Sequence, residues 1–193
     1  MSSLTTLYFI RHAEADNSVH DNRTRPLTER GLCDAAMLAE TLCGTRFDRM
    51  YSSPYKRAVD TISPLAARLG LEIETVEDFR ERRPAGVWVE DFMTFMERQW
   101  DDMTYKLPGG ESLGEVQERF AAAIGKVIVE MEAPSQESAA IATHATALCA
   151  MLNYYNPSFG FEDFLKLVNV TPFVVRFEFE GGEFLHWELV ALA

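Results

Sequence analysis

Short apolar segments alternate with helical periodicities along the first part of the chain, and this alternation constrains the fold more than any other feature. Leu7–Ile10 is strand-like, and apolar residues then recur at helical spacing over Leu32–Leu42. A second strand is predicted over 47–51, a second helix over 54–69 and a third strand over 71–76. Strands that alternate with helices in this way are typical of an α/β protein with a parallel sheet.

Capping and turn residues predict several helix boundaries. Ser53 is suited to cap the second helix, with Pro54 at its first position, and Gly70 to end it. Ser112 and Glu115 have the spacing of a capping box, which predicts that a long helix begins there.

The alternation breaks over 79–107, where an arginine-rich segment precedes a predicted helix at about 90–103. We interpret 79–107 as a small helical insertion over one edge of the sheet. A strand, a helix and a terminal hairpin are then expected over Ala139–Thr143, Ala145–Tyr155, Phe173–Phe179 and Glu183–Val190. The prediction is one domain over 1–193, a three-layer α/β sandwich. Its central sheet has about six mostly parallel strands, with helices on both faces.

Charge and composition exclude some classes of partner. The net charge of −12 argues against a general nucleic-acid surface, which would need many cations. Residues 1–83 carry a net charge of −1 and residues 84–193 one of −11, so an anionic substrate would meet local arginines of the first half. No apolar run has membrane-spanning length and no signal segment is evident, so we expect a cytoplasmic protein without a membrane partner. The oligomeric state is left open.

Three strands of the predicted sheet end at groups that suit a phosphoryl ligand. Arg11 and His12 follow the first strand, Arg57 lies shortly after the second, and His144 follows the fourth. Ligands bind at the carboxyl ends of parallel strands, where arginine can chelate phosphate oxygens and neutral imidazole can act as a nucleophile. These residues therefore predict an anion site at one sheet edge. The alternative is that each side chain lies separately in solvent or in a surface ion pair.

Four short motifs occur in an order that resembles the histidine phosphatase superfamily, the phosphoglycerate mutase-like proteins. They are Arg11-His12-Ala13-Glu14-Ala15, Ser52-Ser53-Pro54-Tyr55-Lys56-Arg57-Ala58, Pro108-Gly109-Gly110-Glu111-Ser112 and Thr143-His144-Ala145. The resemblance runs from about Leu7 to Ala145 and is closest to the phosphatases of this superfamily, since mutases of this type tend to be longer.

The resemblance implies a role for each matching residue. His12 would attack phosphorus and become a phosphohistidine, while Arg11, Arg57 and His144 would hold the transferring oxygens. Glu81 matches the family's proton donor; Glu77, Asp78 and Glu111 are the alternative acids.

Departures from the family pattern affect two further substrate contacts. Asn17 lies one place before the position where the family has a phosphate-binding Asn. Ala145 stands where the family usually has Gly, so its methyl group would lie near the phosphate. We include both residues among the expected substrate contacts.

Four arginines that the motifs do not require are candidates for substrate selection. Arg23 and Arg25 follow the first strand, and Arg82 and Arg83 begin the predicted insertion. If they line the mouth of the site, they would bind a second anionic group of the substrate. The alternative is that they are solvated surface charges.

The sequence predicts a metal-independent phosphomonoesterase that hydrolyses a small phosphorylated metabolite through a phosphohistidine and needs no cofactor. Two alternatives are a mutase of the same family and a non-catalytic phosphate-binding module. A metal site at His12 and His144 is a third, although the spacing of the histidines matches no familiar ligand motif. Cys33, Cys43 and Cys149 also lack such spacing, and we expect them to be buried reduced thiols.

Overall fold

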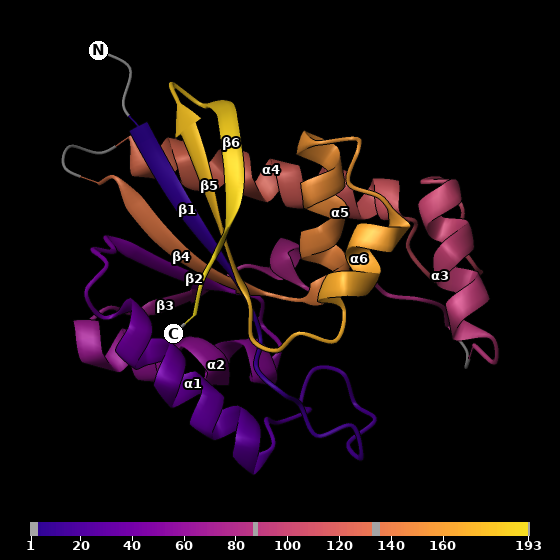
Figure 1. Cartoon of the computed structure of the whole chain (residues 1–193), viewed down its shortest axis with the longest axis horizontal. Helices are drawn as coiled ribbons and strands as arrows, with labels where there is room; N and C mark the ends of the chain where they lie inside the picture. The colour runs from indigo at the N-terminus through magenta and orange to yellow at the C-terminus, as the bar shows by residue number, and fades with distance from the viewer. Residues whose placement is uncertain (1–3, 87–88, 133–135, 193) are drawn as a thin grey trace.

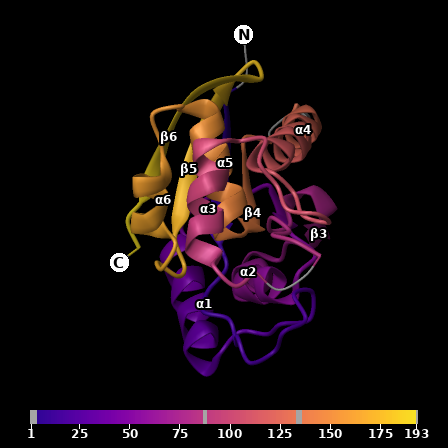
Figure 2. The same cartoon turned by 90° about the vertical axis from the view of Figure 1, so that its right-hand side faces the viewer.

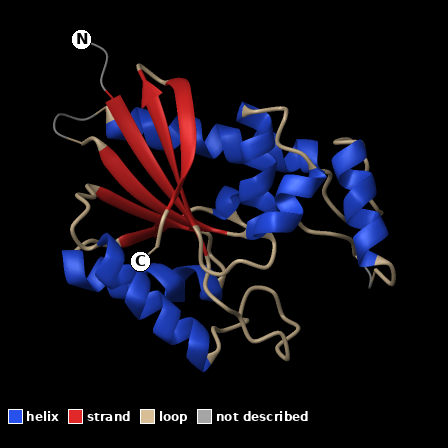
Figure 3. Cartoon of the chain, viewed as in Figure 1, coloured by secondary structure: helices blue, strands red, loops and turns tan. Residues whose placement is uncertain are grey.

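The computed structural model describes residues 4–86, 89–132 and 136–192. Its centre is one six-stranded sheet with the strand order β3-β2-β4-β1-β5-β6. Figure 3 shows these strands as one continuous twisted layer between helices. The strands are β1 (Leu4–Arg11), β2 (Arg49–Ser52), β3 (Ile73–Thr75), β4 (Ser138–Thr143), β5 (Val174–Glu180) and β6 (Glu183–Val190).

The first four strands of the chain run parallel, and the terminal hairpin is antiparallel. β4 lies between β1 and β2 and pairs in parallel with both, while β2 also pairs in parallel with β3. β5 pairs antiparallel with β1 and with β6. The mostly parallel α/β sheet of the prediction is therefore confirmed, and the ends of β1, β2 and β4 meet at one edge.

Helices cover both faces of the sheet (Figure 1). α1 (Glu29–Leu42) and α2 (Lys56–Leu69) lie on one face, and α4 (Leu113–Met131) and α5 (Ala145–Tyr155) lie on the other. The faces have separate cores because successive side chains of a strand point to opposite sides. Phe9 belongs to the core under α4 and α5, whereas Ile10 belongs to the core under α1 and α2.

The remaining helices lie toward the edge at which the parallel strands end. The segment 79–107, predicted as an insertion, follows the 3-10 helix η1 (Glu77–Phe79) and contains α3 (Phe92–Asp101). Seen from that side, α3 lies in front of α5 (Figure 2). The short helix α6 (Phe161–Leu167) packs against α3 through Phe164, whose ring centroid is 5.3 Å from that of Trp100. The sequence did not predict α6, because seven residues are too few to show a clear helical period.

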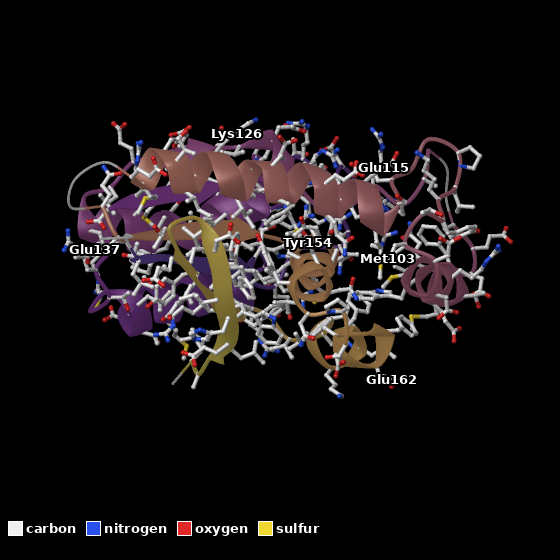
Figure 4. All side chains as sticks on the ribbon, turned by 90° about the horizontal axis from the view of Figure 1, so that it is seen from above. Met103, Glu115, Lys126, Glu137, Tyr154 and Glu162 are labelled. Atoms are coloured by element: carbon white, nitrogen blue, oxygen red, sulfur yellow. The ribbon has the colours of Figure 1, made fainter. Side chains whose placement is uncertain are left out.

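The amino terminus of α4 has the predicted capping box. The Ser112 hydroxyl accepts from the Glu115 amide at 3.1 Å, and the Glu115 carboxylate accepts from the Ser112 amide at 2.9 Å. Gly114 donates its amide hydrogen to the Met103 carbonyl at 2.8 Å, which ties the chain after α3 to this end of α4. In Figure 4 the molecule is seen from above and α4 runs across the view, with Glu115 near one end and Lys126 farther along.

The predicted start of α2 is wrong. The helix begins at Lys56, and Tyr55 stands at the cap position without a side-chain cap hydrogen bond. At Ser53 the chain still pairs with β4, since its amide donates to the Ala142 carbonyl at 2.8 Å, and its hydroxyl accepts from the Tyr55 amide at 3.3 Å, before the helix begins. The end of α2 is confirmed, since Gly70 adopts the left-handed conformation with φ 68°.

Gly31 allows α1 to approach the chain that follows β1. A Cβ atom at Gly31 would lie 2.1 Å from the Glu14 carbonyl oxygen, so no other residue fits without a shift of the backbone. The Thr28 amide donates to that same carbonyl at 3.0 Å. These contacts hold the segment just after His12 against the start of α1.

The cysteine prediction is only partly confirmed. All three thiols are free, and Cys149 is buried, but Cys33 and Cys43 are exposed. Cys33 lies within α1, and Cys43 is the residue that caps its carboxyl end. Within the described residues, no helix has the length and apolar character needed to cross a membrane.

Candidate active site

Two histidines meet where β1 and β4 end. The register pairs Arg11 of β1 with Thr143 of β4, so the residue that follows each strand lies at the same level. The His12 amide continues this pairing by donating to the Thr143 carbonyl at 3.0 Å. The ring centroids of His12 and His144 are 5.1 Å apart, and the predicted convergence of these side chains is therefore observed.

The hydrogen bonds of His12 assign its tautomer. Nδ1 lies 2.7 Å from the Ala13 carbonyl oxygen, which can only accept, so Nδ1 carries the hydrogen. Nε2 therefore has a free lone pair, and it accepts from Nε of Arg57 at 3.1 Å. Burial, with the nearby Arg57 charge, lowers the pKa of His12 from 6.5 to about 3. At neutral pH the ring is an uncharged imidazole, the form that can attack phosphorus.

Two arginines beside His12 are buried, and neither forms an ion pair with a carboxylate in the part of the chain that the structure describes. Arg11 donates from Nη1 to the carbonyls of Leu167 and Val170 at 3.0 and 2.5 Å. Arg57 donates from Nη1 to the Asn22 carbonyl at 2.7 Å. Burial lowers the pKa of Arg57 to about 10, so the guanidinium stays charged at neutral pH. Both groups bind neutral acceptors, so their charge is available to an anionic ligand.

His144 is completely buried, and one of its ring nitrogens has no partner. Nε2 lies 2.8 Å from the Ser53 hydroxyl, while Nδ1 has no hydrogen-bond partner. Burial and the charge of Arg57 hold the pKa of His144 well below its usual value. The ring of His144 contacts the ring of His12, but His144 itself is not among the residues that line the cavity.

Glu81 places a carboxyl group at the same cavity. Its oxygens accept from the amides of Thr146 at 3.2 Å and Ala147 at 3.0 Å, at the start of α5. The Arg82 amide donates to Oε1 at 2.7 Å. These contacts hold the carboxyl group in the wall of the cavity that contains His12.

The alternative acids lie outside this cavity. Glu77 forms ion pairs with Arg23 and Arg80 at 2.5 and 3.6 Å. Glu111 binds Arg80 and Arg119, and the side chain of Asp78 is not part of the cavity wall. Among the four candidate acids, Glu81 alone reaches the cavity.

The cavity has a volume of about 460 Å³ and a positive lining. Four arginines and only two glutamates line it, in a chain whose net charge is −12. Polar side chains complete much of the wall. The lining residues are Arg11, His12, Glu14, Ala15, Asn17, Asn22, Arg25, Arg57, Glu81, Arg82, Pro84, Phe92, Thr146, Val168, Asn169 and Thr171.

The model of the histidine phosphatase superfamily, branch 1, matches residues 7–190 of the chain. This match spans nearly the whole sequence and includes every residue of the site. The chain belongs to the histidine phosphatase superfamily.

Three similar proteins illustrate the range of this superfamily. Phosphoserine phosphatase 1 of Hydrogenobacter thermophilus is 33% identical over 128 residues, which cover 60% of this chain and 61% of that protein. A probable phosphoglycerate mutase, GpmB of Yersinia pestis, is 26% identical over 164 residues, covering 76% and 73% of the two chains. The structure of Bacillus stearothermophilus YhfR matches with a TM-score of 0.75 at 26% identity and covers 94% of each chain.

The predicted substrate contacts of this superfamily member divide into two groups. Asn17 and Arg82 line the cavity. Arg83 is exposed and outside the lining, and its backbone amide and carbonyl bond to the Glu111 carboxylate at 3.0 Å and the Glu111 amide at 2.8 Å. Ala145 is buried at the start of α5, and its neighbour Thr146 faces the cavity instead. Of the other two arginines, Arg25 lines the cavity and Arg23 pairs with Glu77 outside it.

Sequence reasoning missed several residues of the site. Ser53 belongs to the second of the four family motifs, where the sequence predicts a helix cap. No local sequence pattern predicts its contact with His144. Thr146 directly follows the Thr143-His144-Ala145 motif, and its place in the sequence beside this motif could have predicted that it lines the cavity. Asn22 and Asn169 come from loops and show no pattern that points to the site. No three His, Cys, Asp or Glu side chains of the described ranges are grouped so as to hold a metal ion.

Proposed function

We propose that this protein is a phosphomonoesterase that transfers the phosphoryl group of a small ester to His12 and then to water, without a metal ion. The observation that carries this proposal is the tautomer of His12. Its Nδ1–H is held by the Ala13 carbonyl, and its Nε2 lone pair lies beside the Arg57 guanidinium in the positively lined cavity. The nucleophilic nitrogen of His12 and the cation that can bind phosphoryl oxygens, Arg57, are therefore adjacent.

In the first step the phosphate ester displaces the contact between Arg57 and His12. A phosphoryl oxygen takes over the Arg57 N–H, which frees the lone pair of Nε2 to attack phosphorus. The Nε2–P bond forms as the ester P–O bond breaks, and the departing oxygen receives a proton from Glu81. Arg11, Arg57 and His144 would stabilise the equatorial oxygens.

In the second step water attacks the phosphohistidine. Glu81, now a carboxylate, takes a proton from the water as its oxygen bonds to phosphorus. The P–N bond breaks, inorganic phosphate leaves, and His12 returns to its neutral form. Glu81 lies in the cavity wall and can serve both steps.

Metal independence is proposed because the cavity supplies fixed positive charge. Phosphoryl transfer depends mainly on positioning and on charge around the transferring oxygens. Arg11 and Arg57 are buried, hold their side chains with neutral acceptors, and provide this charge permanently.

A mutase is the second candidate, because the relatives include both activities by name. The phosphoserine phosphatase and the probable phosphoglycerate mutase share small phosphorylated acids as the substrates that their names imply. In a mutase the phosphohistidine returns its phosphoryl group to an organic acceptor instead of water. The alignment with the phosphatase spans less than two thirds of that protein, so the phosphatase activity of this chain remains our proposal.

The experiment is a panel assay in the presence of chelator. Phosphate release is measured for sugar phosphates, phosphoglycerates, phosphoserine, nucleotides and an aryl phosphate, and isomerisation of phosphoglycerate is measured in parallel. We expect phosphate release that chelator leaves intact. Isomerisation without net phosphate release would establish the mutase, and loss of activity that zinc or manganese restores would overturn metal independence. Binding without turnover on any substrate would indicate a non-catalytic module.

A further inference from the structure

β6 is the last strand of the sheet, and one edge of its backbone is free. Within the described ranges of the chain, β6 pairs with β5 and with no other strand. Figure 2 shows β6 at the margin of the molecule. Proteins usually protect such an edge with lysine, proline or a very short strand. β6 has eight residues and contains neither lysine nor proline, so its edge is open to pairing with a further strand.

Apolar side chains are exposed along this edge. Leu185 is 49% exposed and Leu189 is 51% exposed, and Trp187 lies between them and is half-buried. Leu185 has no cross-strand partner on β5, because the irregularity beside Phe184 leaves it out of the register. Exposed apolar side chains on a free strand edge are typical of a surface that associates with another chain.

A groove beside β6 extends this apolar surface. It has a volume of about 370 Å³ and is lined by residues of β6, of α6 and of the chain between α5 and α6. Its apolar wall is formed by Phe159, Leu167, Trp187 and Leu189. The groove and the active-site cavity have no lining residue in common. The apolar surface is therefore separate from the site of the proposed hydrolysis.

Pairing of β6 with β6 of a second copy is possible in few registers. In an antiparallel ladder, the two residues of a pair direct their backbone groups the same way, either toward the other strand or away from it. A two-fold axis must therefore pass through a residue that lies opposite its own copy. An axis at Glu188 would oppose two like charges, which destabilises a strand pair. An axis at His186 would place Glu188 against the apolar ring of Phe184.

An axis at Trp187 gives complementary neighbours on both sides. His186 then lies opposite Glu188 of the second copy, and Leu185 lies opposite Leu189 of that copy. Within one chain, His186 approaches Glu178 at 3.7 Å, and Glu188 pairs with Arg176 at 3.0 Å. Opposite charges and apolar residues that face each other across a strand pair stabilise it. This register combines both kinds of match.

We propose that β6 is an interaction surface for a second copy of this chain, and that the two β6 strands pair antiparallel about a two-fold axis at Trp187. The sheets of the two copies then form one continuous sheet, and Leu185 of each copy covers the groove of the other at Leu189. The occupant is a second copy because this one strand supplies both halves of the apolar and the charged matches.

Sedimentation velocity over a range of concentrations tests the association. We expect a reversible dimer with a Kd on the order of 1–100 µM, because one pair of strands forms a smaller interface than a permanent dimer does. A wild type that stays monomeric up to about 300 µM would overturn the proposal.

Lysine substitutions locate the interface. Leu185→Lys and Leu189→Lys each place a charge on the free edge, so each should weaken the dimer at least about tenfold. Leu32→Lys is the matched control, since Leu32 is a leucine of α1 with a similar exposure of 54%, and this variant should dimerise like the wild type. Circular dichroism verifies that all three variants are folded. Unchanged dimerisation in both β6 variants would reject β6 as the interface.

Disulfide cross-linking tests the register. His186→Cys and Glu188→Cys are each made in a chain that carries Cys33→Ser and Cys43→Ser, because those two thiols are exposed. Opposed residues of an antiparallel pair have Cα atoms about 4.5–5.5 Å apart, which is within reach of a disulfide.

A mixture of the two cysteine variants should form an intermolecular disulfide on mild oxidation, and mass spectrometry should locate it between positions 186 and 188. Each variant alone should form far less, because its thiol lies diagonally from its own copy, about 7–8 Å away between Cα atoms. Efficient self-linking of Glu188→Cys would place the axis at Glu188 and reject the register. The absence of a disulfide in the mixture would also reject it.

Discussion

Two sets of arginines with little solvent exposure differ in the groups that hold their guanidiniums. Arg80 and Arg119 both bind the Glu111 carboxylate, with Nη2 of Arg80 at 2.6 Å and Nε of Arg119 at 3.0 Å. Arg11 and Arg57 bind backbone carbonyls, and Arg82 binds a side-chain amide. The first set is compensated by a carboxylate, and the second set is not.

This difference separates charge used for folding from charge used for binding. The Glu111 cluster, formed by Arg80, Glu111 and Arg119, joins η1, the chain after it and α4. Compensation makes it a structural element that offers nothing to a ligand. The cavity arginines remain available because their partners carry no charge, and they make the cavity more costly to fold. We therefore expect substitutions at the cavity to change chemistry and substitutions at the Glu111 cluster to change stability.

The largest effect is expected from His12→Ala. Removal of the covalent nucleophile should lower kcat by a factor on the order of 10⁴ or more, because bound water cannot replace the imidazole. Rapid quenching without acid, followed by mass spectrometry, should locate the phosphoryl group on His12 in the wild type. Phosphate on another residue, or substantial turnover by the variant, would reject the assignment. The variant should unfold at a temperature close to that of the wild type.

The next largest effect is a loss of stability in the Glu111 cluster. Glu111→Ala leaves the guanidiniums of Arg80 and Arg119 buried without their shared partner, so the free energy of unfolding should fall by about 3–5 kcal/mol. Urea denaturation followed by circular dichroism measures this change. Glu77→Ala is a suitable control, because its ion pairs are about half exposed and should contribute under about 1 kcal/mol. Similar losses in both variants would contradict the distinction.

Arg57→Ala should have the opposite effect to Glu111→Ala, a large loss of kcat/KM with little change in the free energy of unfolding. We expect kcat/KM to fall by a factor on the order of a hundred, since one cation no longer stabilises the transferring oxygens. The free energy of unfolding should stay within about 1 kcal/mol of the wild type or rise, because an uncompensated buried charge is removed. The two quantities are measured on the same preparation. A large loss of stability with intact catalysis would place Arg57 with the structural arginines.

The smallest effect is a difference in pH dependence between the two regions. The folded pKa of His12 is about 3 against 6.5 unfolded, so below pH 6.5 the unfolded chain binds protons that the folded protein does not. The pKa of Glu111 is lowered to about 2 by its hydrogen bonds from Arg80, which outweigh its desolvation. Its stabilisation is complete above about pH 4.5 and is lost as the pH falls toward 2.

The two regions should therefore begin to lose stability at different pH values, the His12 region near pH 6.5 and the Glu111 cluster near pH 4.5. His12→Asn should flatten the dependence of unfolding free energy between pH 6.5 and 4.5, where each such group contributes about 1.4 kcal/mol per pH unit. Glu111→Gln should flatten it below pH 4.5. Urea denaturation at pH steps of about half a unit measures both slopes. Identical profiles for the two variants would show that these groups do not titrate as assigned.

Much of the fold and the centre of the site could be predicted from the sequence. Strand and helix periods depend on neighbouring residues, so the alternation predicted the sheet and most helices. Parallel strands end at one edge, so Arg11, His12 and His144 could be expected to converge. The predicted start of α2 is wrong, because the chain still pairs with β4 at Ser53 and the helix begins only at Lys56. The Ser53 hydroxyl contacts His144.

What the sequence by itself determined is the order of elements, the family motifs and the residues at the strand ends, all of which depend on local pattern. Only the tertiary structure decided which arginines are compensated. Arg80, Arg82 and Arg83 lie within four positions, yet they meet a carboxylate, an amide and solvent respectively. Their partners come from positions 17 and 31 residues away, and no local pattern records such distant pairing. Electrostatic compensation depends on distances in space, and those exist only once the chain has folded.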